Sequence, residues 1–411
     1  MNQAIAAFGY FMMIFLAWLM SAHRSKFPVR IVVCGTVLQV SFAALILKTK
    51  PGASFFDAAG AFFTRLINFV EAGSSFVFGE NYANHIFAFK VLPTIIFFSA
   101  LMSVLYHAGV MQLVVRFLAR IMQATLKTSG AESLSAAANI FVGQTEAPLV
   151  VKPYVATMTL SELMAVMVGG FATIAGSVMG IYVTMGVSAA HLMTASVVSA
   201  PAGLLIAKVL QPEVETPKTL GDTGQAMPRT SSNLIEAITN GASDGLSLML
   251  NVAAMLIAFS SLIALVDYCL SETSILLMTQ LGYKNPSPIT LSNALGYLFA
   301  PLAWMMGVAW NECLAVGELL GIKMVATEFV AYKQLGTWIG SPDNPLSERS
   351  VAIVTYALCG FSNFASIGIQ IGGIGAMAPE RRGDLTKIAF RAMLGGTLAC
   401  CMTGCIASIL L

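Results

Sequence analysis

Gln144, Thr145 and Glu146 stand side by side in the stretch "NIFVGQTEAPLVVKPY", between apolar flanks. A carboxylate in such surroundings is costly, and its default interpretation is functional. Amide and hydroxyl groups both donate and accept hydrogen bonds, as a polar planar ring requires. The set favours an uncharged polar ligand over an organic anion, because Lys152 alone among the cations is in a position to face it.

A second acid, Glu328, lies in another apolar stretch, "GIKMVATEFVAY". A carboxylate accepts two hydrogen bonds at once, which suits a vicinal diol. Asn363 and Ser366 are three residues apart and would share one helix face, and Phe361 offers an aromatic surface for stacking. Their neighbourhood also contains Glu312 and Glu318, and the residues alone do not rank these acids against Glu328.

Asn139 and Thr173 place side-chain oxygens near the first acidic stretch and the apolar segment that follows it. Unwound carbonyls and half-helix C-termini hold Na⁺ in carriers. Asn and Thr also hydrogen-bond between membrane helices. The residues alone leave both interpretations open.

The composition indicates which elements must position these groups. Of the 411 residues, 57% are hydrophobic and 10% are charged, whereas soluble domains are about 25% charged. Long apolar runs rather than alternating strand-length patterns favour membrane helices over a barrel. The seven cysteines are scattered without a C-x-x-C pair, which predicts packing roles. Neither an enzyme nucleophile nor a basic nucleic-acid-binding patch is indicated, so we expect an all-α polytopic membrane protein.

The hydropathy pattern predicts eight transmembrane helices, at roughly 3–21, 30–48, 86–107, 165–187, 191–210, 246–268, 351–377 and 388–410. Segments 53–72 and 110–127 carry charges among apolar residues at helical spacing, which predicts interfacial helices. Segments 130–163 and 291–335 have apolar halves too short to cross the membrane, separated by Gly, Pro or acidic residues. Each is predicted to be a re-entrant hairpin, since irregular backbone at membrane depth must be enclosed by protein or face a water-filled cavity.

The distribution of charge agrees with this layout. If both hairpins return to their starting side, the cytoplasmic segments hold most of the basic residues, as the positive-inside tendency requires. Both termini are then expected outside. The cytoplasmic basic residues are Arg24, Lys26, Arg30, Arg116, Arg120, Lys127, Lys208, Lys218, Arg229, Arg381, Arg382 and Lys387.

Two halves of the chain repeat one order of features. An acidic hairpin precedes "GFATIAGSVMG" in the first half and "GFSNFASIGIQIGG" in the second. The predicted hairpins enter from opposite faces. Interrupted segments at corresponding places in inverted halves indicate a transporter's substrate site near the middle of the membrane.

Several long motifs together resemble the concentrative nucleoside transporter family, in particular its bacterial members. The motifs are "VGQTEAPLVVKPY", "GFATIAGSVMGIYVTMGV", "HLMTASVVSAPAGLLIAK", "GIKMVATEFVAY" and "CGFSNFASIGIQIGGIGAMAPERR". The resemblance runs from about "LPTIIFFSALMSVLYHAG" to the C-terminus. It implies a homotrimer in the bacterial cytoplasmic (inner) membrane, with eight spans and two re-entrant hairpins per protomer. It also implies an elevator-type movement of a transport domain against a scaffold.

The resemblance implies a division of the chain into scaffold and transport core. Residues 1–127 would form scaffold and interfacial helices, and 128–211 the first half of the transport core. Residues 212–232 would be a cytoplasmic linker, 233–270 a scaffold or trimerisation helix, and 285–411 the second half of the core.

The resemblance also implies roles for individual residues. Nucleobase contacts would come from Gln144, Thr145, Glu146 and Val178. Ribose contacts would come from Glu328, Asn363 and Ser366, with Phe361 beside the ligand. The sodium ligands would be the side chains of Asn139 and Thr173 and the carbonyls of Val142 and Ile174.

The expected function is secondary active import of a uridine-like nucleoside by symport with a cation, and sodium is the expected coupling ion. No enzymatic cofactor is expected. A proton-coupled symporter is the alternative, because buried glutamates can titrate. One departure concerns Thr327, which stands where the family usually has Asn. Threonine is shorter than asparagine and lacks its amide group.

Overall fold

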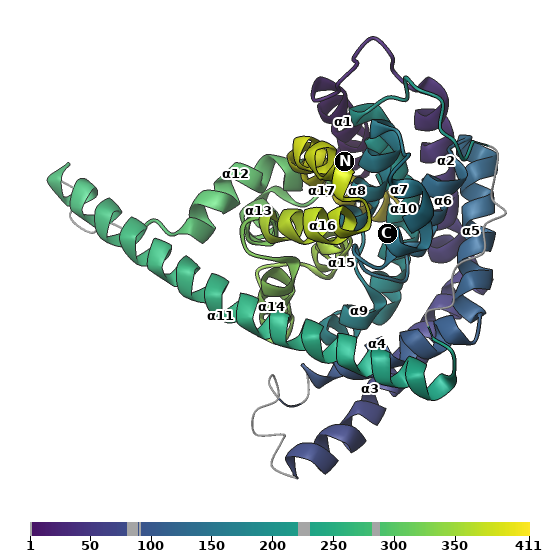
Figure 1. The fold of residues 1–411 in the computed structure, drawn as a ribbon. Helices are drawn as coiled ribbons and strands as arrows, with labels where there is room; N and C mark the ends of the chain where they lie inside the picture. The colour runs from purple at the N-terminus through teal and green to yellow at the C-terminus, as the bar shows by residue number, and fades with distance from the viewer. Residues whose placement is uncertain (1, 80–88, 90–91, 221–230, 282–287) are drawn as a thin grey trace.

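The computed structural model describes residues 2–79, 89, 92–220, 231–281 and 288–411 (Figure 1). Across these ranges the regular structure is entirely helical and includes no strand. The prediction of an all-α membrane protein is confirmed. The first half has α1 (Asn2–Leu19), α2 (Val29–Lys48), α3 (Lys50–Phe78), α4 (Pro93–His107), α5 (Val110–Leu126), α6 (Gly130–Ala138), η3 (Ala147–Val151), α7 (Lys152–Val155), α8 (Leu160–Ala172), α9 (Gly176–Thr184) and α10 (Ala189–Leu210).

The second half begins with one very long helix. Its elements are α11 (Leu234–Gln280), α12 (Leu291–Met305), η4 (Trp310–Glu312), α13 (Cys313–Val325), α14 (Glu328–Ile339), α15 (Glu348–Leu358), α16 (Phe364–Met377), η5 (Pro379–Arg381) and α17 (Arg382–Leu410). Much of the predicted linker, 221–230, lies outside the described residues.

Among the described residues, six helical segments are long and apolar enough to cross a membrane, or seven if the bent pair α4–α5 counts as one span. Five of the predicted spans correspond closely to α1, α2, α8–α9, α10 and α17. The prediction for 246–268 was too short, since α11 runs to Gln280 and its spanning window is Ser261–Gln280. The predicted span 86–107 begins outside the described residues and continues as α4.

The predicted interfacial segments are helices with wider or nearly equal bounds. The first, 53–72, belongs to α3, whose N-cap Thr49 accepts a hydrogen bond from Gly52. The second, 110–127, is α5, which bends away from α4 by 77°. Gly109 precedes α5 with φ +81°, a left-handed conformation that glycine adopts without strain.

Hairpin 1 is shorter than predicted. Its first arm is α6, its turn spans 139–146, and its second arm is η3 followed by α7, which ends at Val155. The predicted boundary at 163 was wrong because α8 already begins at Leu160. There Thr159 caps the helix and Glu162 bonds back to the Thr159 N–H, which completes a capping box.

Hairpin 2 also differs from its predicted bounds, 291–335. Residues 291–305 form the separate helix α12, which packs along α13. The hairpin itself is α13 and α14, with its tip at Ala326 and Thr327. Thr327 is the N-cap of α14 and its side chain accepts a hydrogen bond from Val330. Glu328 therefore opens the second arm.

The predicted span 351–377 is not continuous. It divides into α15 and α16 at residues 359–363, just as α8 and α9 divide at 173–175. The two breaks meet, since the Phe361 N–H donates to the Thr173 carbonyl at 3.2 Å. A Cβ on Gly360 would lie 2.6 Å from the Phe171 carbonyl oxygen, so only glycine permits this approach.

The root of hairpin 1 is held by a buried polar cluster. A second capping box joins Ser129 to Glu132 at the start of α6. The Lys208 ammonium, from the end of α10, lies 2.6 Å from the Glu132 carboxylate and donates to Ser161 at 2.9 Å. Ser129 also donates to Glu162 at 2.6 Å. The start of hairpin 1 is thereby tied to the end of α10 and to the first turn of α8.

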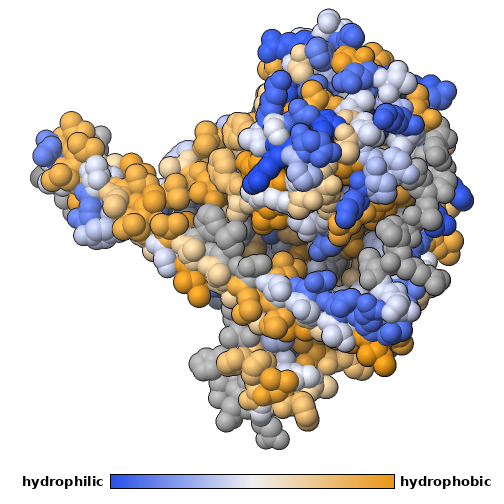
Figure 2. Space-filling model, viewed as in Figure 1, coloured by the Kyte–Doolittle hydropathy of each residue, from blue (hydrophilic) through white to orange (hydrophobic). Residues whose placement is uncertain are grey.

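Helix α11 packs on α4 and then projects beyond the main body of the molecule, where the start of α12 contacts it (Figure 1). Gly241 and Gly245, in the sequence "GASDG", allow the contact, because a Cβ at either position would lie 2.7 Å from a Cα of α4. Small residues four apart commonly serve this purpose in membranes. The window Ser261–Gln280 contains no buried residue, and its surface is largely apolar (Figure 2).

Candidate functional site

A row of hydrogen bonds connects the tips of the two hairpins. The Gln144 amide donates to the Ser366 hydroxyl at 3.0 Å. The Ser366 N–H donates to the Asn363 side-chain oxygen at 2.8 Å, and the Asn363 amide donates to the Glu328 carboxylate at 2.8 Å. All four residues are buried. The structure therefore brings together four residues that the sequence placed at a common site.

The break between α15 and α16 positions two of these residues. Asn363 is the N-cap of α16, so its side chain bonds to the backbone N–H of Ser366 rather than sharing a helix face with it. The prediction of one continuous helix face was wrong in this detail. As the N-cap, Asn363 uses its side-chain oxygen to accept a hydrogen bond from the first turn of α16. Its amide nitrogen remains available to donate to Glu328.

Two further residues complete the row and were missed from the sequence. Tyr182 of α9 donates to Glu328 at 3.2 Å and its ring stacks on Tyr332 with 4.3 Å between centroids. Gln370 of α16 donates to the Gln144 side-chain oxygen at 3.0 Å. A single polar residue in "IGIQIGG" was the signal for Gln370, whereas nothing distinguished Tyr182 from other aromatic packing residues.

Glu146 lies apart from this row. Its side chain is solvent-accessible and lines a cavity of about 470 Å³ between hairpin 1 and the helices α4 and α11. Asp244 of α11 and Tyr106 of α4 line the same cavity. A cavity of this size is within the range of small-molecule sites, roughly 300–1,000 Å³.

The other predicted substrate residues surround these two features. Val178 is buried next to Ser177, which lines the cavity. Thr145 is half-buried and its methyl group lies against Gly373, where an added Cβ would come within 2.9 Å. Phe361 is half-buried in the break before α16. Lys152 is exposed on α7.

Asn139 is fully buried, and neither its side-chain oxygen nor its nitrogen has a hydrogen-bond partner among the described residues. Thr173, at the end of α8, donates its hydroxyl to the Gly169 carbonyl at 2.9 Å. Gly169 also faces the Asn139 amide. An unpartnered buried amide is costly, and a cation on its oxygen would relieve that cost.

The oxygen atoms available as ligands at this point suit a hard monovalent cation. Val142 and Ile174 are buried, Val142 on the turn of hairpin 1 that follows Asn139 and Ile174 directly after Thr173 in the break of α8–α9. Amide, hydroxyl and carbonyl oxygens suit sodium. Within the described ranges no cluster of three or more His, Cys, Asp or Glu residues offers a transition-metal site.

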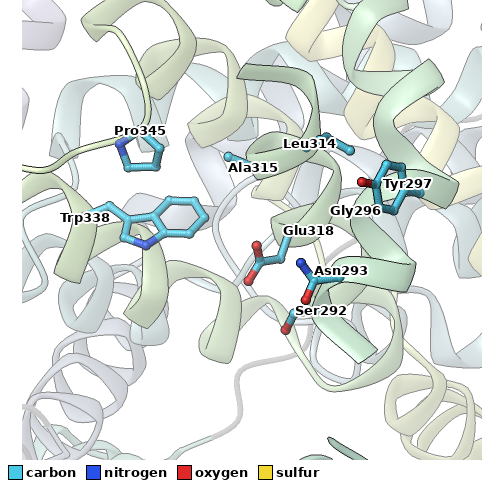
Figure 3. Close-up of a pocket in the computed structure, with 9 residues that line it drawn as sticks. All are labelled: Ser292, Asn293, Gly296, Tyr297, Leu314, Ala315, Glu318, Trp338 and Pro345. Atoms are coloured by element: carbon cyan, nitrogen blue, oxygen red, sulfur yellow. The ribbon is translucent and has the colours of Figure 1, made fainter. Parts of the chain in front are cut away.

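The remaining acids of the second half have other partners. Glu318 accepts from Gln334 at 2.6 Å and lines a separate pocket of about 280 Å³ between α12, α13 and α14, beside Trp338 and Asn293 (Figure 3). Glu312 accepts from Ser347 at 3.0 Å, at the root of hairpin 2. Only Glu328 reaches the row between the hairpin tips, and this distinguishes it from the other two.

Comparison with known families gives a consistent result along the chain. The profile described as "Na+ dependent nucleoside transporter C-terminus" matches residues 191–408, and the corresponding N-terminal profile matches 8–81. A profile described as "Nucleoside recognition" matches the intervening residues 88–189.

Individual proteins resemble the chain over its whole length. It is 44% identical to solute carrier family 28 member 3 of Homo sapiens, of whose length it spans 60%. It is 45% identical to an uncharacterized transporter of Haemophilus influenzae, over 98% of that protein. The chain therefore spans about 60% of the animal relative and nearly all of the bacterial one.

Solved structures agree with the fold. The structure of CNTnw in an inward-facing substrate-bound state has a TM-score of 0.91 at 40% identity, covering 100% of this chain and 98% of that one. A CNTnw variant in an outward-facing state gives the same TM-score, identity and coverage. On its sequence matches and its fold, the chain belongs to the Na⁺ dependent nucleoside transporter family.

Proposed function

We propose that this protein is a secondary active transporter that imports nucleosides by symport with sodium. The observation that carries the proposal is the buried row Gln144–Ser366–Asn363–Glu328, which joins the tips of both hairpins. Family membership supports the same function. The row contains donors, acceptors and a carboxylate in a low-dielectric setting, where each hydrogen bond to a ligand is strong and an unmet one is costly.

A bound nucleoside would form hydrogen bonds to these residues in place of some of the hydrogen bonds that they now make to one another. Gln144, Thr145 and Glu146, with Val178, would bind the nucleobase. Its polar edge can replace the Gln144–Ser366 hydrogen bond, while Glu146 closes the site from the side of the cavity. Because the exchange replaces one polar contact with another, it leaves few unpaired groups in the bound state.

The ribose would bind at hairpin 2. Glu328, Asn363 and Ser366 would hold its hydroxyls, with Phe361 beside the ring. The carboxylate of Glu328 already accepts from Asn363 and Tyr182 and is fixed between them. A carboxylate held in this way is preorganised to accept two hydroxyls without further loss of side-chain freedom.

Sodium would bind where Asn139 and Thr173 converge, with the carbonyls of Val142 and Ile174. These groups come from the turn of hairpin 1 and the break of α8–α9. A cation there would fix the turn that carries Gln144, so that sodium favours the nucleoside-loaded form. Coupling requires such a difference in affinity between states.

Movement would carry the hairpins, the two broken helices, α10 and α17 as one body past a scaffold that includes α4 and α11. The cavity between hairpin 1 and α4–α11 supports this division. The exposed apolar face of α11 fits a homotrimer, in which copies of the chain cover one another. The setting would be the bacterial inner membrane, with both termini outside.

Ligand binding by the purified protein tests the proposal. In Na⁺ buffer, uridine should raise the unfolding temperature of the protein and give a saturable binding signal in isothermal titration calorimetry. Both effects should be much smaller in choline buffer at equal ionic strength. Ribose and uracil offered separately serve as controls, because each engages only one hairpin. Equal uridine binding in both buffers would contradict sodium coupling, and no binding of any nucleoside would contradict the substrate class.

A further inference from the structure

Lys323 is a lysine on the first arm of hairpin 2 that is only 1% exposed. Its ammonium donates to the Ala357 carbonyl at 2.9 Å. Ala357 belongs to the last turn of α15, immediately before the break at 359–363. A buried charge is unfavourable unless it is compensated, so this position must supply negative potential.

Two sources of negative potential meet at Lys323. The last carbonyls of α15 carry the negative end of that helix dipole. Glu328 begins the other arm of the same hairpin, five residues further along the chain, and is buried as well, so its charge attracts the ammonium across the hairpin tip. The lysine thus compensates both the end of the broken helix and the acid at the hairpin tip.

The first half of the core has the same arrangement with one difference. There too a hairpin arm, α6, packs against a broken helix, α8, and Asn139 at its end faces Gly169 in the last turn of that helix. The protein groups at that point are the unpartnered amide of Asn139 and the hydroxyl of Thr173. Among the described residues no lysine is found at this contact, so a cation there would have to come from solution.

We propose that Lys323 is a tethered cation that does for hairpin 2 what the exchangeable sodium ion does for hairpin 1. It is a positioning residue, which holds the end of α15 and orients Glu328 without touching the ligand. The inference rests on the proposed function, since it assigns Lys323 a part in nucleoside binding. It follows that the ribose-binding groups of hairpin 2 are already positioned in the absence of sodium. Sodium would then promote nucleoside binding through hairpin 1.

Replacement of Lys323 by methionine tests the idea, because methionine keeps much of the length and apolar volume and removes the charge. Two quantities are measured on the purified full chain. The first is the rise in unfolding temperature caused by Na⁺ alone, and the second is uridine affinity at saturating Na⁺. Lys387→Met, on the exposed side of α17, is the matched control and should leave both at wild-type values.

The expected result for Lys323→Met is a separation of the two quantities. Uridine affinity should fall at least tenfold, while the response to Na⁺ alone stays within twofold of wild type. A purely structural role would lower both together, and that outcome overturns the inference, as does unchanged uridine affinity. If the wild-type chain binds no nucleoside, the proposed function fails first and the role of Lys323 fails with it.

Chemical rescue provides a second test that does not depend on the folding of the methionine variant. Lys323→Ala removes four heavy atoms, which propylammonium replaces. Protein purified with propylammonium should bind uridine and lose at least tenfold in affinity when the amine is dialysed out. Propan-1-ol, of the same size but neutral, should not restore binding. Equal restoration by both compounds would show that volume rather than charge matters, and would overturn the inference.

Discussion

The Asn363 side-chain amide donates to the Glu328 carboxylate at 2.8 Å. This contact joins the second arm of hairpin 2 to the N-cap of α16, two elements separated by α15 in the chain. Asn363 is held as an N-cap and Glu328 also accepts from Tyr182. The acid therefore has a fixed orientation before any ligand arrives, and this is the relationship on which ribose recognition depends.

Replacement of Glu328 by glutamine should weaken uridine binding by about 1.5–3 kcal/mol, the range for hydrogen bonds to charged groups. At 25 °C this corresponds to roughly a 10- to 150-fold loss of affinity. Isothermal titration at saturating Na⁺ measures it. Glu318→Gln, which changes an acid in the separate pocket of Figure 3, should bind normally. Normal binding by Glu328→Gln would remove Glu328 from the site.

Replacement of Asn139 by alanine should lower the apparent affinity for Na⁺ more than the affinity for uridine at saturating Na⁺. The physical reason is the loss of a buried side-chain oxygen that has no protein partner. Titration of uridine uptake against Na⁺ concentration measures the effect, with the partly exposed loop residue Asn344→Ala as control. A sodium response identical to wild type would reject this site.

Replacement of Gly245 by alanine should destabilise the protein, although alanine favours helix by up to about 1 kcal/mol. The added Cβ would come within 2.7 Å of the Ile96 Cα, so α4 and α11 must separate. Overpacking of this kind costs about 1–3 kcal/mol. Gly372→Ala is the matched control, because no atom lies within 4 Å of its added Cβ. Thermal unfolding should place Gly245→Ala below wild type and Gly372→Ala at or above it.

Replacement of Lys208 by methionine should destabilise the protein by about 3–5 kcal/mol, because it leaves the Glu132 carboxylate as an uncompensated buried charge. The two side chains are 3% and 1% exposed. Asp384→Ala breaks the more exposed pair with Arg381 and should cost no more than about 1 kcal/mol. Denaturant unfolding compares the two. Similar losses for both variants would contradict the role given to the cluster at the root of hairpin 1.

Polarity in an apolar setting made much of the site predictable. Gln144, Glu328, Asn363 and Ser366 were conspicuous because each is costly in a membrane helix without a purpose. The structure brings these four together. Tyr182 was not predictable, since an aromatic ring that packs on Tyr332 looks like any core residue until its hydroxyl is located.

The break in 351–377 was hidden for a different reason. The stretch is mostly apolar, and its scattered polar residues, such as Asn363, Ser366 and Gln370, do not mark where the helix stops. What unwinds the helix is the crossing with α8–α9, where Phe361 bonds to Thr173. Hydropathy reports the length of an apolar segment and carries no information on such a tertiary contact. For the same reason, α12 was predicted to be part of hairpin 2.

Uptake of labelled uridine into proteoliposomes tests the central claim most directly. Three conditions are compared, namely an inward Na⁺ gradient, an inward proton gradient, and neither. The account predicts accumulation above the external concentration with the Na⁺ gradient alone, abolished by Glu328→Gln. Accumulation driven by protons instead would contradict sodium coupling, and equilibration without accumulation under every condition would contradict symport itself.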